Sequence, residues 1–422
     1  MMPSSVLLLL IVVAMLLLRQ NIIIILAIVV SYIHLVWGDG DILYLLEDAW
    51  IAIDKEALLS IPMFILVGAV MTRGSIAKRL IDVMIALTRN WRGGLGAASI
   101  LSCAVFAAIS GSSPVTLLAV GAVLYPALIQ QNYSERFSLG ALTSGGTLGI
   151  IIPPSIPLII FGIATETSIV DLFVAGLLPG LMLTTVLVAY ALFVNRDIAP
   201  PREDAKTLGE ALRSGGPALF MPILLLGGIY SGIFTPTESA AVALFYSLIV
   251  EAFIHREIGF RDIYQIVQET IAMLGSLIPI VAIAASVNIF LAAEGIPADI
   301  TDWVQENISN VILFILFLNI LLLLVGMVMD TISALLILGP LLLPIAVSFG
   351  IHPVHLGIIV VLNLEIGLLT PPMGLNLLVA STAFKSRFGQ VALSVLPFIG
   401  LMICVLMLVS FVPALSLLFL GY

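Results

Sequence analysis

Charged residues are scarce in this chain. Asp, Glu, Lys and Arg together make up 10% of its 422 residues, whereas a soluble globular protein carries roughly a quarter. This shortage excludes a soluble globular fold. The few charges sum to a formal −9, which argues against a nucleic-acid partner, because nucleic acids attract basic surfaces.

Cysteine and histidine are equally sparse. Cys103 and Cys404 stand alone in apolar segments, so no disulfide framework is expected. The four histidines show no metal-ligand spacing on a helix, and His352 and His355 flank a proline in a predicted loop. We therefore expect neither a metal centre of this kind nor a cofactor.

Apolar residues are abundant instead. They make up 61% of the chain, and the mean hydropathy is +1.24. Runs near or above about 18 residues recur along the whole length, which predicts an all-α polytopic membrane protein. The first run lacks a basic leader, so we expect a membrane helix there and not a signal peptide. Spanning segments are predicted at 4–18, 22–37, 58–72, 136–165, 168–195, 215–233, 238–254, 268–295, 354–385 and 389–420.

Two further apolar stretches, 95–129 and 310–348, are interrupted by polar residues in the middle. The first has arms of about 15 residues, or about 22 Å as helix, which is too short for a hydrocarbon core of about 30 Å. This predicts a re-entrant helical hairpin. The arms of the second are a few residues longer, so its assignment as a hairpin depends on an internal repeat.

The repeat has a fixed offset of 218 positions (331 less 113). It superimposes Ser113 on Thr331, Gly149 on Gly367, and Pro153-Pro154 on Pro371-Pro372. Each half therefore reads as a polar tip, an apolar run, and a helix broken at a proline pair. Paired interrupted segments in two halves of a membrane protein point to a transporter's binding site.

Basic residues gather in alternate connecting segments. The segments 39–56, 165–171 and 299–306 are acidic or nearly uncharged. The alternate connecting segments carry Arg73, Lys78, Arg79, Arg89, Arg92, Arg136, Arg196, Arg202, Lys206, Arg213, Arg256, Arg261, Lys385 and Arg387. The basic set is expected to be cytoplasmic. The two hairpins then enter from opposite faces, which predicts an inverted repeat. Residues 76–90 are predicted to form an interfacial amphipathic helix, and 41–57 and 203–214 read similarly but less clearly.

The first tip reads Ser110-Gly111-Ser112-Ser113-Pro114. Such a run cannot continue a helix in hydrocarbon, and non-helical backbone at that depth is tolerated only along a cavity or inside protein. Its carbonyls and hydroxyls suit Na⁺, and the helix that restarts at Pro114 presents amides to an anion. Close packing of helices through small residues is the alternative.

The matching break contains Gly145, Gly146, Thr147 and Gly149 before the proline pair, and Ser155 after it. Two adjacent prolines interrupt a helix because both lack an amide donor. Freed carbonyls on one side suit a cation, and amides after Pro154 suit an anion. A simple proline kink is the alternative.

The second half departs from the first by placing two acids in the membrane. Asp330 stands at the tip Met327-Val328-Met329-Asp330-Thr331, and Glu365 precedes Gly367. Asp330 either completes a Na⁺ site or caps the helix that starts at Thr331, and the cap is slightly favoured. Glu365 either binds an ion or is a buried structural acid. Thr235-Pro236-Thr237-Glu238 is assigned to a capping box that opens the helix 238–254.

The tips and breaks contain no Arg or Lys. A carboxylate bound there must be neutralised by helix N-termini and bound cations. This couples anion binding to Na⁺ and predicts a symporter.

These motifs resemble the large membrane subunit of TRAP transporters, the tripartite ATP-independent periplasmic family (DctM type). The resemblance spans nearly the whole chain and is carried by 109–114, 145–155, 235–241 and 368–374. It implies Na⁺-driven uptake of a small organic acid by an elevator mechanism, in the bacterial or archaeal inner membrane. It also implies a small four-helix Q subunit, expected here as a separate polypeptide, and a periplasmic P subunit that delivers substrate.

The resemblance also implies a division of the chain and a set of site residues. The scaffold is expected at 1–93 and 167–308, the transport domain at 94–166 and 309–386, and a C-terminal transmembrane helix at 387–422. The Na⁺ residues expected are Ser110, Gly111, Ser112, Gly145, Gly146, Thr147 and Gly149 in one site, and Met329, Asp330, Thr331, Gly367, Thr370 and Pro371 in the other. The substrate residues expected are Ser112, Ser113, Pro114, Pro154, Ser155, Thr331, Pro372, Gly374 and Asn376.

Three other functions are compatible with parts of this pattern. A receptor-independent Na⁺/dicarboxylate-type elevator symporter fits the symmetry equally well. An intramembrane enzyme is disfavoured because no His or Lys stands in either interrupted core to act as a base for Ser110, Ser112 or Ser113. A channel fits less well, because hairpins from opposite faces suit alternating access. The substrate is left open among sialic acid, C4-dicarboxylates, other organic acids and ectoine-like zwitterions.

Overall fold

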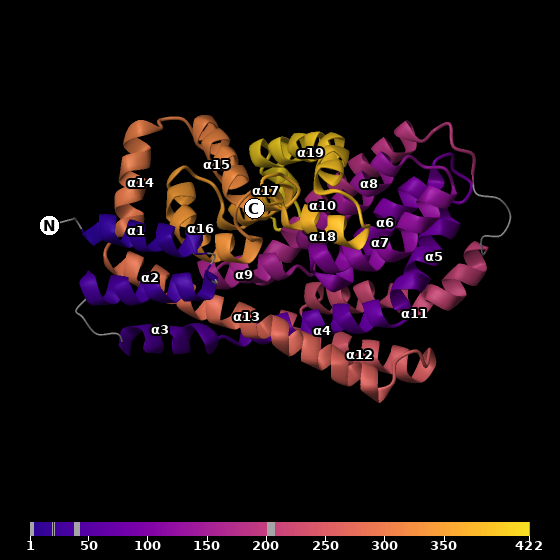
Figure 1. Ribbon diagram of the computed structural model, residues 1–422, viewed down its shortest axis with the longest axis horizontal. Coiled ribbons are helices and arrows are strands. Elements are labelled where there is room, and N and C mark those ends of the chain that lie inside the picture. Colours follow the sequence, from indigo (N-terminus) through magenta and orange to yellow (C-terminus); the bar gives the residue numbers. More distant parts are fainter. Residues whose placement is uncertain (1–3, 19, 21, 38–42, 201–206, 422) are drawn as a thin grey trace.

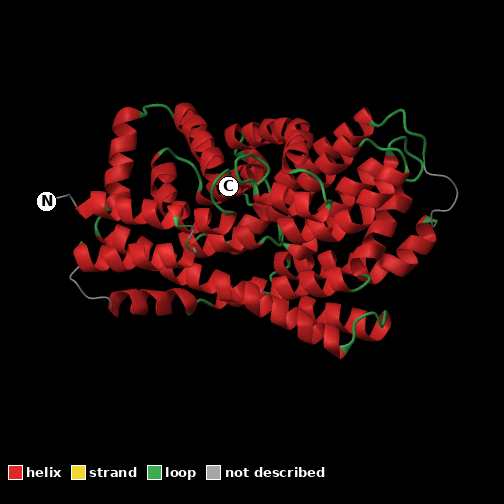
Figure 2. Cartoon of the chain, viewed as in Figure 1, coloured by secondary structure: helices red, strands yellow, loops and turns green. Residues whose placement is uncertain are grey.

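The computed structural model describes residues 4–18, 20, 22–37, 43–200 and 207–421. All regular structure within these residues is helical (Figure 2). Nine helices among them are long and apolar enough to cross a membrane. The chain is therefore an all-helical polytopic membrane protein, as its composition predicts.

The order of the helices follows the predicted segments closely (Figure 1). In chain order they are α1 (Ser4–Leu17), α2 (Ile22–Val36), α3 (Leu43–Ile53), η1 (Glu56–Leu59), α4 (Ser60–Arg73), α5 (Ile76–Thr88), α6 (Gly94–Ser110), α7 (Ser113–Gln130), α8 (Glu135–Ile151), α9 (Ile156–Thr165), α10 (Ile169–Val194), α11 (Leu208–Tyr230), α12 (Pro236–Ile249), η2 (Val250–Ile254), α13 (Phe260–Ala293), α14 (Ile296–Asn307), α15 (Val311–Gly326), α16 (Thr331–Ser348), α17 (Pro353–Gly367), α18 (Leu375–Ala383), α19 (Phe388–Phe411) and α20 (Ala414–Leu417).

The two halves of the chain contain the same helices at the offset of 218. Helix α7 shifted by that number coincides with α16 at both ends, and α8, α9 and α10 fall on α17, α18 and α19. The two hairpins lie toward opposite ends of the molecule, α6–α7 on the right and α15–α16 on the left of Figure 1. Their arms are similar in length, at 17 and 18 residues in the first and 16 and 18 in the second. The second hairpin's arms are therefore not the longer ones that its sequence indicates.

Both proline pairs interrupt their helices, as predicted. Helix α8 ends at Ile151 and α9 begins at Ile156, and α17 ends at Gly367 and α18 begins at Leu375. The Pro153-Pro154 and Pro371-Pro372 peptide bonds are both cis. The repeat therefore extends to the backbone conformation of the two breaks.

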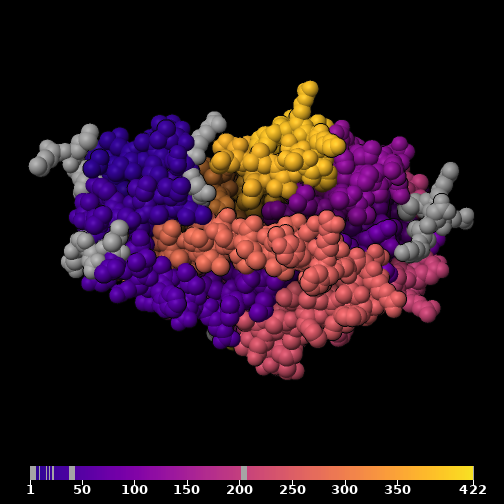
Figure 3. Space-filling model, turned by 60° about the horizontal axis from the view of Figure 1, so that its bottom comes forward, coloured from indigo at the N-terminus to yellow at the C-terminus, as the bar shows by residue number. Residues whose placement is uncertain are grey.

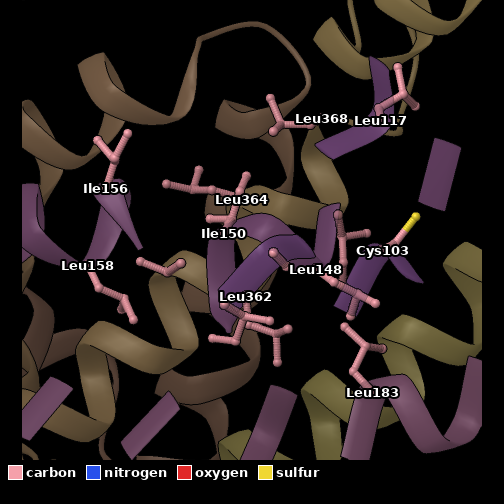
Figure 4. Close-up of a cluster of buried hydrophobic side chains, with 14 of the residues drawn as sticks. Cys103, Leu117, Leu148, Ile150, Ile156, Leu158, Leu183, Leu362, Leu364 and Leu368 are labelled. Carbon is pink, nitrogen blue, oxygen red and sulfur yellow. The ribbon is translucent and has the colours of Figure 1, made fainter. Parts of the chain in front are cut away.

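Helix α8 and its continuation α9 form the centre of the molecule. Of their most apolar window, 89% is buried inside the protein. Figure 4 shows why: Leu148 and Ile150 of α8 are surrounded by Cys103, Leu117 and Leu183 and by leucines of α17. Glycine allows this close packing, since a Cβ on Gly146 would lie 2.8 Å from the Leu117 Cβ. The central helices are thus packed against neighbouring helices on nearly all sides and expose little surface outside the protein.

A layer of four helices covers one side of this centre. Helices α3, α4, α12 and α13 lie along the lower edge of Figure 1, and α13 crosses the face in Figure 3 as an orange band. At 34 residues, α13 is about 51 Å long, so it exceeds the hydrocarbon core. This layer and the central helices meet at the candidate site.

Several boundaries differ from those predicted. Helices α1 and α2 have 14 and 15 residues, or about 21–23 Å, and neither is among the nine long spans. The segment 203–214 is not a separate amphipathic helix: its residues from Leu208 on form the first turns of α11, and 203–206 lie outside the described residues. The acidic segment before the second hairpin is a helix, α14. The helix predicted at 76–90, shifted by 218 positions, falls on 294–308 and so corresponds to α14 in the repeat.

Candidate functional site

The two hairpin tips meet at one cavity of about 150 Å³, although they come from opposite ends of the molecule. The first tip contributes Gly111 to Pro114 and the second contributes Asp330 to Ile332. The remaining walls are Ile65, Ile150, Ile156, Pro157, Met273, Leu277, Leu368 and Leu375. The cavity therefore has small polar groups from two tips and otherwise apolar walls.

The first tip is a short non-helical turn. Gly111 ends α6 in the left-handed region (φ 58°), which favours glycine, and Ser112 is extended. The Thr116 hydroxyl donates to the Ser112 carbonyl at 2.9 Å, and its oxygen lies 2.7 Å from the Ser110 hydroxyl. These contacts fix the turn at the start of α7.

The first break holds this tip from the other side. The Ile156 amide donates to the Gly111 carbonyl at 3.2 Å, so the start of α9 is bonded directly to the tip. The Ser155 hydroxyl accepts from the Leu158 amide at 3.3 Å and donates to the Ile150 carbonyl. Ser155 is thus the N-cap of α9 and bridges the two parts of the broken helix.

The glycines of α8 have different neighbours. A Cβ on Gly149 would lie 2.7 Å from the Ser112 carbonyl oxygen, so Gly149 packs on the tip itself. Gly145 faces Cys103 in the middle of α6, and Gly146 faces Leu117 of α7. Of these three predicted Na⁺ residues, Gly149 contacts the tip. Gly145 and Gly146 pack instead against the two arms of the hairpin, α6 and α7.

Asp330 at the second tip is the N-cap of α16. Its Oδ1 accepts from the Ser333 amide at 2.9 Å, which confirms the cap expected from the sequence. The next side chain is different: Thr331 is 7% exposed, and its hydroxyl oxygen has no hydrogen-bond partner among the described residues. A buried hydroxyl without a partner is costly unless a ligand or water completes it.

The second break approaches its tip as closely as the first does. The Met373 amide donates to the Met327 carbonyl at 3.3 Å. A Cβ on Gly367 would lie 2.6 Å from backbone atoms of Gly326, so glycine is required there. The Thr370 hydroxyl donates to the Ile366 carbonyl at 2.9 Å. A cavity of about 180 Å³ lies between tip and break, lined by Met329, Asp330 and Gly374 among others.

A buried hydrogen bond joins the first tip to the broken helix of the second half. The side-chain amide of Asn376, at the start of α18, donates to the hydroxyl of Ser113 in the first tip. Both residues are fully buried, and the amide oxygen of Asn376 has no partner among the described residues. Two residues predicted to bind substrate from separate halves therefore lie together.

Glu365 lies next to Thr147, the residue that the 218 offset superimposes on it. The Thr147 hydroxyl donates to the Ser144 carbonyl at 2.6 Å, and neither carboxyl oxygen of Glu365 has a hydrogen bond of good geometry within the described residues. Glu365 is completely buried. The pair therefore marks where the two halves meet in the protein interior.

The structure brings part of the predicted set into the shared cavity. Its lining contains Gly111, Ser112, Ser113, Pro114, Asp330 and Thr331. It also contains Ile65, Met273 and Leu277, from α4 and α13. No sequence pattern distinguishes these three, because they are ordinary apolar residues in apolar helices. Thr235 forms the expected capping box with Glu238 at the start of α12.

Comparison with known proteins gives a consistent result. A family described as "Tripartite ATP-independent periplasmic transporter, DctM component" matches residues 9–415. The C4-dicarboxylate TRAP transporter large permease protein DctM of Pseudomonas aeruginosa is 42% identical over 367 residues, which is 86% of each chain. The isethionate TRAP transporter permease protein DctMQ of Oleidesulfovibrio alaskensis is 37% identical over 382 residues, 90% of this chain and 60% of that one. Among solved structures, the Alcanivorax borkumensis YdaH transporter matches with a TM-score of 0.60 at 13% identity, over 92% of this chain and 90% of that chain.

Proposed function

Because the chain belongs to the DctM component family of tripartite ATP-independent periplasmic transporters, we propose that it moves a small organic acid inward together with Na⁺ by an elevator mechanism. As a member it is a TRAP large permease for organic acids, a multi-pass protein of the bacterial inner membrane, and not an enzyme.

The convergence of both hairpin tips on one cavity carries the proposal. Helices α7 and α16 both begin there, so the positive dipole ends of two helices lie beside the same space, and at α16 the Asp330 carboxylate already accepts from the Ser333 amide. An inverted repeat with two re-entrant hairpins and two broken helices accounts for this arrangement. An anion is the natural occupant of such a space.

Na⁺ coupling is supported by the charge at the site. The lining described above includes the carboxylate of Asp330 and no Lys or Arg. An anion there needs a nearby cation, and the carbonyls and hydroxyls of the tips are hard oxygen donors of the kind Na⁺ prefers. The unpaired hydroxyl of Thr331 supports the second of the two expected ion sites.

The elevator mechanism is supported by the character of the scaffold wall. In the proposed division, 94–166 and 309–386 move, and 1–93 and 167–308 are static. The static part contributes only the apolar side chains of Ile65, Met273 and Leu277 to the cavity. These three apolar side chains cannot hydrogen-bond to the tips. Away from the cavity, Asn288 donates to the Leu336 carbonyl and Lys55 to the Ile163 carbonyl, so sliding would have to break these two bonds.

The proposed partners are a small four-helix Q-type subunit and a periplasmic receptor of the P type. The family is described as a tripartite system, and the name of the Oleidesulfovibrio relative, DctMQ, combines M and Q components. Lipid surrounds the exposed apolar side chains of the long helices.

The test is uptake into proteoliposomes that contain this chain and its Q-type partner, with the receptor outside. We expect accumulation of an organic acid driven by an inward Na⁺ gradient and abolished when choline replaces Na⁺. Unchanged uptake in choline would disprove the coupling. Uptake that persists without receptor would instead favour the receptor-independent symporter.

A further inference from the structure

We propose that the cavity between the two tips selects a small monocarboxylate with a short apolar body, and discriminates against dicarboxylates and large sugar acids. This inference rests on the proposed function and narrows its substrate class. It follows from the size of the cavity, the position of its polar groups, and the chemistry of its remaining walls.

Size sets the first limit. The cavity measures about 150 Å³, and a protein cavity of about 150 Å³ holds a molecule the size of benzene. Typical pockets for larger ligands measure about 300–1,000 Å³. An acid of roughly four to six carbons fits this space by that comparison, whereas sialic acid would extend beyond it toward the second cavity, which shares Asp330 and Leu375 with the first.

The polar groups occupy the part of the lining formed by the tips. Ser112, Ser113, Asp330 and Thr331 belong to the two tips and flank the first residues of α7 and α16. Helix N-termini attract carboxylates, and the buried, unpaired hydroxyl of Thr331 supplies a further donor. One carboxylate therefore has partners at the tips, with Na⁺ offsetting the charge of Asp330.

The other walls of the cavity contain no partner for a second carboxylate. They consist of aliphatic side chains, Met273 and Pro157, and no Lys, Arg or His is present among the described lining residues. An ionised carboxylate placed against such a wall loses its hydration without gaining a partner, which is strongly unfavourable. An apolar tail placed there is instead removed from water.

The substrate expected from this chemistry differs from the one in the name of a relative. The Pseudomonas relative is named for C4-dicarboxylates, which match the cavity in size but carry two charges. Short-chain monocarboxylates, including 2-oxo acids with a branched apolar tail, match it in both size and charge. The discriminating comparison is thus between acids of equal length with one or two carboxylates.

The test measures thermal unfolding of the purified permease with its Q-type partner, in NaCl and in choline chloride. The probes are butanoate, 3-methyl-2-oxobutanoate, succinate and sialic acid. In NaCl we expect saturable stabilisation by the two monocarboxylates, with an apparent affinity at least tenfold above that for succinate and none for sialic acid.

The outcomes separate the two proposals. Na⁺-dependent stabilisation by succinate or sialic acid, equal to or stronger than that by the monocarboxylates, overturns the substrate class and leaves the proposed function standing. Absence of stabilisation by every acid in both salts overturns the cavity as the site of either. Equal stabilisation by monocarboxylates in NaCl and choline supports the substrate class and contradicts Na⁺ coupling.

A variant pair tests the cavity itself. Leu277 is 6% exposed and lines the cavity from α13, so Leu277→Ala enlarges the apolar end and should shift preference from butanoate toward hexanoate by about tenfold or more. Ile271 lies on the same helix, is 61% exposed and is not part of the lining, so Ile271→Ala should leave the preference unchanged. The same shift in both variants, or in neither, would refute the assignment of this wall.

Discussion

Asn376 and Ser113 are hydrogen-bonded to each other across 263 positions of the chain. Ser113 is the first residue of α7, and Asn376 lies in the first turn of α18. The bond thus ties the tip of the first hairpin to the broken helix of the second half. The side-chain amide oxygen (Oδ1) of Asn376 has no partner in the described part of the chain, so it is available to a ligand or ion.

The first prediction concerns this bond. Asn376→Ala leaves the Ser113 hydroxyl buried without its donor, and a lost buried hydrogen bond costs about 0.5–1.5 kcal/mol. We expect Na⁺-driven uptake to fall about three- to tenfold. Ser113→Ala should have a similar effect, and the double variant should be no worse than the worse single one. Additive losses, measured as initial uptake rates, would show that the two side chains act independently.

The second prediction concerns the two glycines against the tips. Gly149→Ala and Gly367→Ala place a Cβ 2.7 Å from the Ser112 carbonyl oxygen and 2.6 Å from Gly326 backbone, respectively. Since backbone must shift, we expect the Na⁺ concentration for half-maximal uptake to rise about tenfold or more. Gly227→Ala is the matched control, because a Cβ there meets nothing within 4 Å. It should stabilise α11 by up to about 1 kcal/mol and leave Na⁺ dependence unchanged.

The third prediction separates the two roles of Asp330. Asn is as good an N-cap as Asp, whereas Ala costs about 1 kcal/mol. Asp330→Asn should therefore unfold at the wild-type temperature but require about tenfold more Na⁺ for uptake. Asp330→Ala should lose both properties. If Asp330→Asn has wild-type Na⁺ dependence, the carboxylate serves only as a cap. Thr235→Ala, which removes the cap of α12, should lower stability without changing Na⁺ dependence.

The fourth prediction concerns Glu365. Its carboxyl is completely buried and lacks a cationic partner among the described residues, and charge in such a place is costly. Glu365→Gln keeps the volume without a charge, so it should fold and unfold like the wild type. Glu365→Ala leaves a cavity and should lose roughly 2–3 kcal/mol. A well-folded Glu365→Gln protein that has lost uptake would assign the carboxyl a direct role in ion binding.

Much of the fold follows from the sequence because membrane helices obey simple length and polarity rules. Both proline pairs interrupt their helices where expected, since proline removes the amide that a continuous helix needs. The hairpins are predictable because non-helical backbone in the middle of an apolar run is tolerated in a membrane only inside protein or along a cavity. The cap at Asp330 was expected from the same local chemistry.

The rest depends on contacts that no local pattern encodes. Ile65, Met273 and Leu277 line the cavity, yet in sequence they are indistinguishable from lipid-facing residues. Gly145 and Gly149 occur in one run, and only the packing of α8 shows that the second touches the tip. Helix α14 was missed because its acidic residues were interpreted as a loop.

The sparse cysteines have a practical consequence. Cys103 is buried in the packed centre and Cys404 is exposed on α19, and the sequence contains no other. A single replacement, Cys404→Ser, would therefore leave one shielded thiol that reagents reach poorly. In that background, spin labels or fluorophores attached to engineered cysteines would report distances between the hairpins and the long helices during a transport cycle.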